Sequence, residues 1–427
     1  MNEQSFIILG GGGDLAKRLL IPGIGQYANL FRANLGLVGA DMAEEIDYPS
    51  LVSESFATAG IEGEQSAAMA GSATYEQVDA TSAEDMTMLL AGKKNPVLYF
   101  ALPPTITQRA LEVLKEIELP DGLIVALEKP IGDSATTARE VNELLASFLP
   151  EKQIFRVDHF LGMSATINIG TLRDDNRIID PVWNNEHLDE IRIVFNETLG
   201  LEGRAAFYDK TGATIDMIHS HLIQVMAHTL ADATDGPDEI LKATTATSVR
   251  RGRYTAGSVN GRQLPSYANE EGVAPESTTE TWARVEMAVD TDRWRGVPIL
   301  LESGKAIGNP RQEITAIFKT ENGTTANKLR LAFESDDLLL ELNVADPAQK
   351  SPARVSLASG LVPSQLGAYG RVAAGILQHQ EHMKLSGEAS EQGWRILEPV
   401  LESFDQYPLE EYEAGTTPGT GPVLESF

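Results

Sequence analysis

The sequence predicts an α/β protein with two domains: a doubly wound domain at the N-terminus and an α+β domain with a large, mainly antiparallel sheet at the C-terminus. Three observations predict this fold class. Short apolar runs alternate with helical segments up to about residue 150, glycines end the first apolar run, and segments of alternating apolar and polar residues begin near residue 188. Because 427 residues exceed what a single core usually needs, we expect domains over residues 1–157 and 158–427.

The N-terminal domain is expected to alternate strands with helices. The first strand covers residues 5–9, and a helix with apolar spacing follows over residues 14–27. Further apolar runs predict strands at residues 35–38, 96–102 and 123–127. This alternation is typical of βαβ units, which form a parallel sheet covered on both faces.

The C-terminal domain has a different pattern. Apolar and polar residues alternate at 190–195, 281–288, 315–318 and 329–333. This period of two predicts an antiparallel sheet with one covered face. Helices are expected between and after these strands, at residues 213–230 and from 366 to about 404.

The composition excludes some classes of partner. The chain has 34 Lys and Arg against 62 Asp and Glu, which gives a net charge of −28. Such a charge repels phosphate backbones and anionic lipid surfaces, so we expect no nucleic-acid and no membrane partner. Cysteine, a signal-peptide pattern and an apolar run of membrane-spanning length are all absent, and we expect a cytoplasmic protein without disulfides.

Four glycines stand between the first strand and the first helix. Gly10, Gly11, Gly12 and Gly13 would let backbone N–H groups approach a pyrophosphate at the N-terminus of the helix. The Gly-x-Gly-x-x-Gly fingerprint is incomplete, because Leu15 occupies its third glycine position. A flexible turn is the alternative, but strand, turn and helix together favour a Rossmann-like dinucleotide-binding domain over residues 1–157.

From this point the sequence resembles the glucose-6-phosphate dehydrogenase family. Gly13 is followed by Asp-Leu-Ala-Lys, as in the opening signature of that family, and further motifs follow in the family's order to about residue 405. They include Tyr-Phe-Ala-Leu-Pro-Pro at 99–104, Glu-Lys-Pro-Ile-Gly at 128–132, Arg-Val-Asp-His-Phe-Leu-Gly at 156–162 and Ala-Tyr-Gly-Arg at 368–371. The resemblance implies an enzyme that oxidises C1 of glucose 6-phosphate to 6-phosphogluconolactone, with hydride transfer to NAD or NADP.

Oxidation of a lactol to a lactone needs a base, because the C1 hydroxyl loses its proton as hydride leaves C1. A histidine titrates in the right range, and His221 is the candidate. The resemblance implies that His221, which ends an Asp-x-x-x-x-His pattern, is this base and that Asp158 orients its imidazole. The alternative is that His221 is a structural histidine of the helix at 213–230.

The resemblance also implies ligand-binding residues. Asp158 and His159 are expected to begin a helix that runs through Thr166, where N–H groups and the imidazole would bind the sugar phosphate. Lys129 is expected to contact both ligands; the alternative is a solvated loop lysine. The substrate residues are expected to be Lys129, His159, Phe160, Glu197, Asp216, Lys305 and, as a replacement cation at a shifted spacing, Arg311. The cofactor residues are expected to be Gly10, Gly11, Gly12, Gly13, Asp14, Leu15, Asp41, Pro104 and Lys129.

Two positions depart from the family pattern. Met163 stands where the family has a lysine on the phosphate, and one charge-assisted contact is worth roughly 1.5 to 3 kcal/mol. This leaves open a hexose without the phosphate or with another 6-substituent. Asp41 stands where NADP-preferring members have an arginine, and an acid there favours NAD by binding the ribose hydroxyl. The family favours NADP, and Asp41 could also be a turn residue, so both cofactors remain open.

The sequence also bears on a metal site, on a silent relative and on assembly. A zinc site made of His219, His221 and His228 is rejected, because residues two apart face different sides of a helix, and no metal is required. A catalytically silent regulatory relative is a further alternative, which the presence of Asp158, His159, Lys129 and His221 together opposes. We expect a homodimer or homotetramer from the family resemblance.

Overall fold

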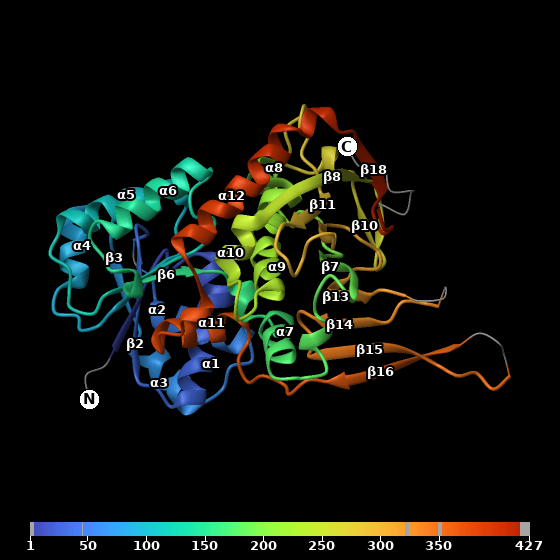
Figure 1. Ribbon diagram of the computed structural model, residues 1–427. Helices are drawn as coiled ribbons and strands as arrows, with labels where there is room; N and C mark the ends of the chain where they lie inside the picture. Colours follow the sequence, from blue (N-terminus) through green and yellow to red (C-terminus); the bar gives the residue numbers. More distant parts are fainter. Residues whose placement is uncertain (1–3, 45, 321–323, 349–351, 419–427) are drawn as a thin grey trace. The chain divides into compact units, whose positions relative to one another are not determined.

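The computed structural model describes residues 4–44, 46–320, 324–348 and 352–418 (Figure 1). The chain forms two compact units. The first unit comprises Met1–Gly162 and Ser364–Glu391, and the second comprises Met163–Pro363 and Gln392–Phe427. The sequence predicted one division, between residues 157 and 158; in the structure the chain also returns to the first unit near its C-terminus.

The first unit is built on a sheet of seven strands in its described part, in the order β17-β6-β5-β4-β1-β2-β3. All neighbouring pairs are parallel except β17 with β6. The strand order reverses beside β1, and doubly wound sheets bind their ligands at such a switch point. The strands are β1 (Gln4–Leu9), β2 (Leu35–Asp41), β3 (Thr74–Gln77), β4 (Val97–Phe100), β5 (Ile124–Leu127), β6 (Ile154–Val157) and β17 (Lys384–Leu385).

Helices cover both faces of this sheet, as the sequence predicted. Phe6 and Ile8 pack into one core, and Ile7 and Leu9 pack into another, because successive side chains of a strand point to opposite faces. The first core is completed by α1 (Ile21–Phe31), α2 (Tyr48–Thr58), α3 (Glu64–Ser72) and α11 (Ala368–Leu377). The second is completed by α4 (Ala83–Leu90), α5 (Pro104–Glu116) and α6 (Ala135–Ala146).

The second unit is built on a sheet of nine strands in its described part, in the order β16-β15-β14-β13-β7-β12-β11-β8-β18. The pairs β12–β7 and β18–β8 are parallel, and the other neighbours are antiparallel. The strands are β7 (Leu188–Asn196), β8 (Thr244–Thr255), β11 (Trp282–Val289), β12 (Ile299–Gly304), β13 (Gln312–Phe318), β14 (Lys328–Ala332), β15 (Asp337–Val344), β16 (Ala353–Gly360) and β18 (Leu409–Glu413). A small hairpin is formed by β9 (Gly257–Val259) and β10 (Arg262–Leu264).

One face of this large sheet is covered by helices. The π-helix η5 (Thr214–Leu222) packs on β7 and β12, α7 (Ser164–Asp174) packs on β14, and α8 (Ala205–Ala213) and α10 (Pro237–Ala243) pack on β11. The chain continues from η5 into α9 (Ile223–Leu230), and α12 (Gly387–Glu402) follows α11 in sequence. The prediction of a mainly antiparallel sheet with one covered face is confirmed.

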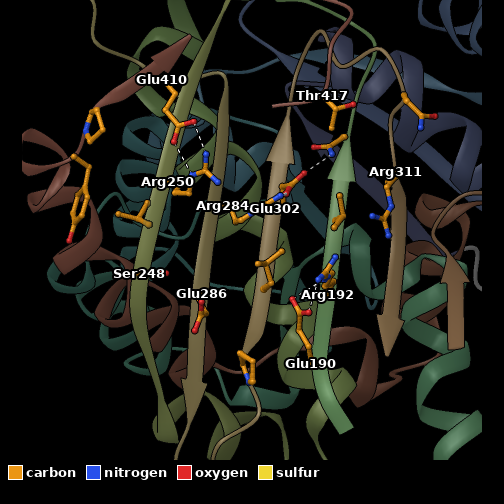
Figure 2. A pocket seen from close by; sticks show the side chains of 18 residues that line it. Glu190, Arg192, Ser248, Arg250, Arg284, Glu286, Glu302, Arg311, Glu410 and Thr417 are labelled. Atoms are coloured by element: carbon orange, nitrogen blue, oxygen red, sulfur yellow. Dashed lines mark hydrogen bonds and ion pairs between the residues drawn. The ribbon is translucent and has the colours of Figure 1, made fainter. Parts of the chain in front are cut away.

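The other face of the same sheet contains a hollow of about 490 Å³ (Figure 2). Alternate side chains of the central strands line it, and its arginines are paired with acids. Arg284 of β11 donates to Glu302 of β12, and Arg250 of β8 donates to Glu410 of β18. The hollow therefore has charged walls in which each of these two cations is already neutralised.

Several helix boundaries differ from the sequence-based predictions. The helix expected at 14–27 continues to Phe31 and includes a π-helical segment, η1 (Ala16–Leu20). The helix expected at 213–230 is the π-helix η5 followed by α9, and the helix expected from 366 to about 404 is two helices, α11 and α12. Apolar spacing predicts that a segment is helical, but it does not distinguish a π-turn from an α-turn or mark a short break.

Candidate active site

The glycine turn follows β1 as predicted. Gly10 has φ 81°, a left-handed conformation, and a Cβ atom there would lie 2.4 Å from the carbonyl oxygen of Ala101 after β4. Only glycine fits this place without strain. The helix then begins directly, because Lys17 N–H donates to the Gly13 carbonyl at 3.1 Å. Backbone N–H groups and a helix N-terminus thus lie at the switch point of the sheet.

Asp14 and Leu15 occupy the first turn of that helix. Asp14 is exposed, whereas Leu15 packs against the apolar core on one face of the sheet. Leu15 is therefore accommodated where the dinucleotide fingerprint has its third glycine, and the glycine turn itself keeps its shape. The incomplete fingerprint still gives the expected strand-turn-helix geometry.

Asp41 is the last residue of β2, three residues beyond the strand end that the sequence predicted. One carboxylate oxygen lies 3.4 Å from the place a Cβ atom would take on Gly12, so the carboxylate stands beside the glycine turn. Its other oxygen accepts the N–H of Met42 at 2.8 Å. The first contact favours the ribose-binding role, and the second is what a turn residue would show.

Lys129 and Asp158 form a buried ion pair at the carboxyl ends of β5 and β6. The Lys129 Nζ lies 3.1 Å from an Asp158 carboxylate oxygen, and the two side chains are 5% and 0% exposed. Burial lowers the pKa of Lys129, and the charge of Asp158 opposes this shift. Lys129 is therefore not the solvated loop lysine that the sequence left as an alternative. Together with Pro104, the first residue of α5, it lines a hollow of about 70 Å³.

A second acid beside this pair was not predicted. Glu128 accepts hydrogen bonds from the hydroxyls of Tyr99, in β4, and Tyr369, in α11, the latter at 3.1 Å. Burial raises the pKa of Glu128 to about 7, and the two tyrosine hydrogen bonds oppose this rise. Glu128 and the two tyrosines all belong to the family motifs named above. The position of Glu128 next to Lys129, an expected ligand residue, could have pointed to it.

His159 lies between two aromatic rings. It stacks on Tyr369 with a centroid distance of 5.1 Å and an interplanar angle of 20°. The buried Phe160 ring meets it edge-on, also at 5.1 Å. Phe160 fixes the imidazole by packing and can offer a ligand only apolar contact.

The helix expected to start at Asp158 begins later. Asp158 accepts the N–H of Phe160 on its side chain and the N–H of Leu161 on its carbonyl, which closes the short 3₁₀ turn η3 (His159–Gly162). The following α-helix, α7, starts at Ser164, with Met163 as its N-cap residue. The prediction that N–H groups of an α-helix N-terminus lie at His159 is therefore wrong.

In the second unit, Glu197 and Lys305 form another ion pair. They follow the neighbouring parallel strands β7 and β12, whose last residues Asn196 and Gly304 are opposite each other. The Lys305 Nζ lies 2.6 Å from Glu197 Oε2 and 5.3 Å from the ring centre of Tyr208. The two expected substrate residues are thus brought together.

Arg311 does not join them. Its guanidinium donates to Glu313 at 2.9 Å and lines the hollow shown in Figure 2. The expectation that Arg311 replaces the missing phosphate cation receives no support from this geometry, because the side chain is held by Glu313, two residues away in β13.

Asp216 and His221 are on η5, five residues apart. A π-helix closes i to i+5 hydrogen bonds, which places residues five apart nearly above one another, whereas an α-helix would turn them apart. Burial raises the pKa of Asp216, and electrostatic interactions with Lys305, Arg204 and His221 oppose the rise. The π-helical conformation thus joins the acid and the histidine of the Asp-x-x-x-x-His pattern to the Lys305 pair.

His219 does not share this surface. Its ring is buried, with its centroid 3.8 Å from that of Trp394. The two histidines of the His-x-His pattern therefore have different surroundings.

The glucose-6-phosphate dehydrogenase NAD-binding domain matches residues 7–168, and the C-terminal domain of the same family matches residues 170–423. The chain belongs to the glucose-6-phosphate dehydrogenase family. This family consists of oxidoreductases, so the chain is a nicotinamide-dependent enzyme by family and the resemblance noted in the sequence is confirmed.

Relatives match over nearly the full length. Glucose-6-phosphate 1-dehydrogenase of Gluconobacter oxydans is 32% identical over 96% of this chain and 93% of its own, and that of Rhizobium meliloti is 29% identical with the same coverage. The crystal structure of the Mycobacterium avium enzyme, 27% identical, superposes with a TM-score of 0.84 over 97% of this chain and 94% of its own. A glucose-6-phosphate dehydrogenase in complex with glucose-6-phosphate shares the fold, with a TM-score of 0.86 at 23% identity and coverage of 98% and 96%. In the part of the chain that the structure describes, the helices are too short or too polar to cross a membrane.

Proposed function

We propose that this enzyme oxidises C1 of glucose 6-phosphate to 6-phosphogluconolactone and transfers the hydride to NAD or NADP. The observation that carries the proposal is the π-helical turn that presents Asp216 and His221 on one surface, in a chain of this family. The names of the relatives and the substrate bound to one structural neighbour support the choice of sugar.

The chemistry follows from the residues of η5. The His221 imidazole accepts the proton of the C1 hydroxyl, and the Asp216 carboxylate on the same helical surface accepts a hydrogen bond from a sugar hydroxyl. Asp158 is assigned as the carboxylate that orients the imidazole on the family resemblance. The bound nicotinamide supplies the hydride acceptor.

The sugar and its phosphate are assigned to charged pairs. Glu197 and Lys305 bind sugar hydroxyls, since each keeps hydrogen-bonding capacity beyond their mutual contact. His159, held between two rings, and Lys129 bind the phosphate. Met163 in place of a lysine favours a second candidate, a hexose without the 6-phosphate.

The first unit fits a dinucleotide. The four glycines leave the turn without side chains, so a pyrophosphate could approach its main chain closely. The N–H groups of Gly10, Gly11 and Gly13 donate to the carbonyls of Ala40 and Gly10, so the N–H groups at the start of the helix are the ones expected to bind the phosphates. Gly10, Gly11, Gly12, Gly13 and the helix that starts at Asp14 would hold the phosphates. Asp41 would hold the adenosine ribose, which favours NAD.

Initial rates with glucose 6-phosphate or glucose, each with NAD or NADP, test these assignments. We expect a higher kcat/KM for glucose 6-phosphate and use of NAD at least comparable to NADP. A kcat/KM for free glucose equal to or above that for the phosphate would favour the second candidate, and no turnover with any pair would reject the proposal. A preference for NADP above about a hundredfold, roughly 2.7 kcal/mol, would mean that Asp41 faces away from the ribose.

We also propose a cytoplasmic homodimer or homotetramer, on the sequence-based expectations alone. Sedimentation equilibrium of the purified chain measures the assembly directly. A monomer at micromolar concentration would reject it.

A further inference from the structure

A buried acid stands at the start of the helix that holds the proposed base. Glu280 precedes β11 and is 3% exposed. Its side-chain Oε1 accepts the N–H of Thr214 at 3.0 Å, and its carbonyl accepts the N–H of Ala213 at 3.2 Å. One residue therefore binds two consecutive N–H groups where η5 begins.

The chain is shaped to admit this carboxylate. Gly212 breaks the helix before η5, with φ 58° and ψ −177°, and a Cβ atom there would lie 2.4 Å from Glu280 Oε1. The N-cap residue Ala213 has no side-chain cap of its own. Glu280 supplies the missing cap from another element, with a carboxylate that suits the positive end of a helix.

The next residue holds a second part of the site. The Thr281 carbonyl accepts the N–H of Lys305 at 2.9 Å. The Tyr412 hydroxyl donates to the Lys305 carbonyl at 2.8 Å and lies 2.8 Å from Thr281 Oγ1. Because Tyr412 has one hydroxyl proton, which it donates to Lys305, Thr281 is the donor in the bond between the two hydroxyls. The N–H of Lys305 is thus bonded to Thr281, and its carbonyl is bonded to Tyr412, which Thr281 holds.

We propose that Glu280, Thr281 and Tyr412 are positioning residues that fix the π-helix of His221 and the Lys305 segment in one register. The inference rests on the proposed function, which assigns the base to His221 and a sugar contact to Lys305. Two consecutive residues at the start of β11 then set the distance between base and sugar contact. Loss of the Glu280 bond to Thr214 should displace His221, and loss of the Tyr412 bond to the Lys305 carbonyl should displace Lys305.

Kinetics of three variants test the inference. Glu280→Leu removes the cap, and we expect kcat to fall about tenfold to a hundredfold, the cost of a small misplacement of a catalytic group. Glu280→Gln keeps an acceptor oxygen and should stay within about threefold of wild-type kcat. Tyr412→Phe should raise KM for the sugar about three- to tenfold with little change in kcat, because it loosens a binding contact.

The matched control is Glu302→Gln. Glu302 is an equally buried acid of the same unit, 5% exposed, whose side chain lines the hollow in Figure 2 and not the start of η5. It should leave kcat unchanged even if it lowers the melting temperature; the sugar KM is not part of this control, because Glu302 accepts a hydrogen bond from Asn196, next to Glu197, at 2.9 Å. In all four variants KM for the nucleotide should stay unchanged, because the glycine turn belongs to the first unit.

Amide hydrogen exchange over residues 213–222 gives a readout that needs no substrate. Exchange at Thr214 should be about tenfold faster in Glu280→Gln and faster still in Glu280→Leu, because a weaker acceptor protects the amide less. Unchanged exchange at Thr214 in Glu280→Leu, or wild-type kcat in a folded Glu280→Leu, overturns the inference for η5. Wild-type KM in Tyr412→Phe overturns it for Lys305. A wild type inactive on glucose 6-phosphate rejects the proposed function alone, since the exchange test still stands and the kinetics can use whichever hexose is oxidised.

Discussion

The two units each hold a lysine–carboxylate pair at the ends of neighbouring parallel strands, but they bury the pairs to different depths. Lys129 and Asp158 follow β5 and β6, are 3.1 Å apart and have side chains 5% and 0% exposed. Lys305 and Glu197 follow β12 and β7, are 2.6 Å apart and have side chains 10% and 25% exposed. Parallel neighbours bring two carboxyl ends to one edge of a sheet, which explains why a mainly antiparallel sheet keeps a parallel pair here.

The difference in burial indicates different uses. A fully desolvated pair must stay intact, because either partner left alone would be an uncompensated buried charge. In the second pair the Lys305 side chain is nearly as buried as that of Lys129, but the Glu197 carboxylate is 25% exposed and can exchange hydrogen bonds with a sugar. We therefore expect the first pair to matter for stability as well as for activity, and the second mainly for binding.

The largest expected effect concerns the base beside the second pair. His221→Asn should lower kcat by on the order of 10² to 10⁴, because a positioned general base contributes that much, while the sugar KM changes little. Stopped-flow or steady-state rates measure it. A variant that retains more than a tenth of wild-type turnover would falsify the assignment of His221 as the base.

Removal of the lysine from each pair should affect the free energy of unfolding to different extents. Lys129→Met leaves Asp158 buried without its cation and should lower the free energy of unfolding by about 3 to 5 kcal/mol. Lys305→Met, its matched control, leaves Glu197, whose side chain is 25% exposed, and should cost less, because water can solvate that carboxylate. Urea titrations of both variants measure the difference. Equal losses would show that depth of burial does not separate the pairs.

Much of the fold could be predicted because the first sheet is buried on both faces. Residues 6–9 are apolar without interruption, and the structure divides them between two cores. The return of Ser364–Glu391 to this unit could not be predicted, because β17 is two residues long and pairs with β6, more than two hundred residues earlier. Such a pairing leaves no local periodic signal.

The family motifs supply the candidate site residues, which stay predictions, whereas backbone conformations that depend on local hydrogen bonds were missed. Lys129 with Asp158 and Glu197 with Lys305 are found as pairs, although their pairing itself was not foreseen. The helix expected at His159 starts at Ser164, because Asp158 bonds the N–H groups just after it. Arg311 bonds an acid two residues away, a competition that a spacing argument does not weigh.

The stability of the protein should depend on pH through Glu128. Glu128, next to Lys129, has an ordinary pKa of 4.5 that burial raises to about 7. The folded state then keeps a proton that the unfolded chain has lost, so stability falls as pH rises from about 4.5 to 7, by on the order of 3 kcal/mol. Glu128→Gln removes this dependence and keeps acceptors for the two tyrosines. The melting temperature of Glu128→Gln relative to wild type should therefore be higher at pH 8 than at pH 5. An equal difference at both pH values would mean that Glu128 is already ionised at pH 5.

Restoring the family's lysine at position 163 should have a modest effect. Met163 is the N-cap residue of α7 and makes no side-chain cap, so a lysine there disturbs no hydrogen bond of the described structure, although a cation at a helix N-terminus costs a few tenths of a kcal/mol. If the substrate is a 6-phosphate, Met163→Lys should lower KM for glucose 6-phosphate several-fold with kcat unchanged, because a phosphate contact is equal in the ground and transition states. If the natural substrate lacks the phosphate, the same change should create or improve activity on glucose 6-phosphate and leave the natural reaction unaided. His159→Ala separates these cases, since it should weaken binding of a phosphorylated sugar far more than that of a neutral one. Equal losses for glucose and glucose 6-phosphate in His159→Ala would remove His159 from the phosphate site and leave Lys129, in the buried pair, as the remaining cation assigned to it.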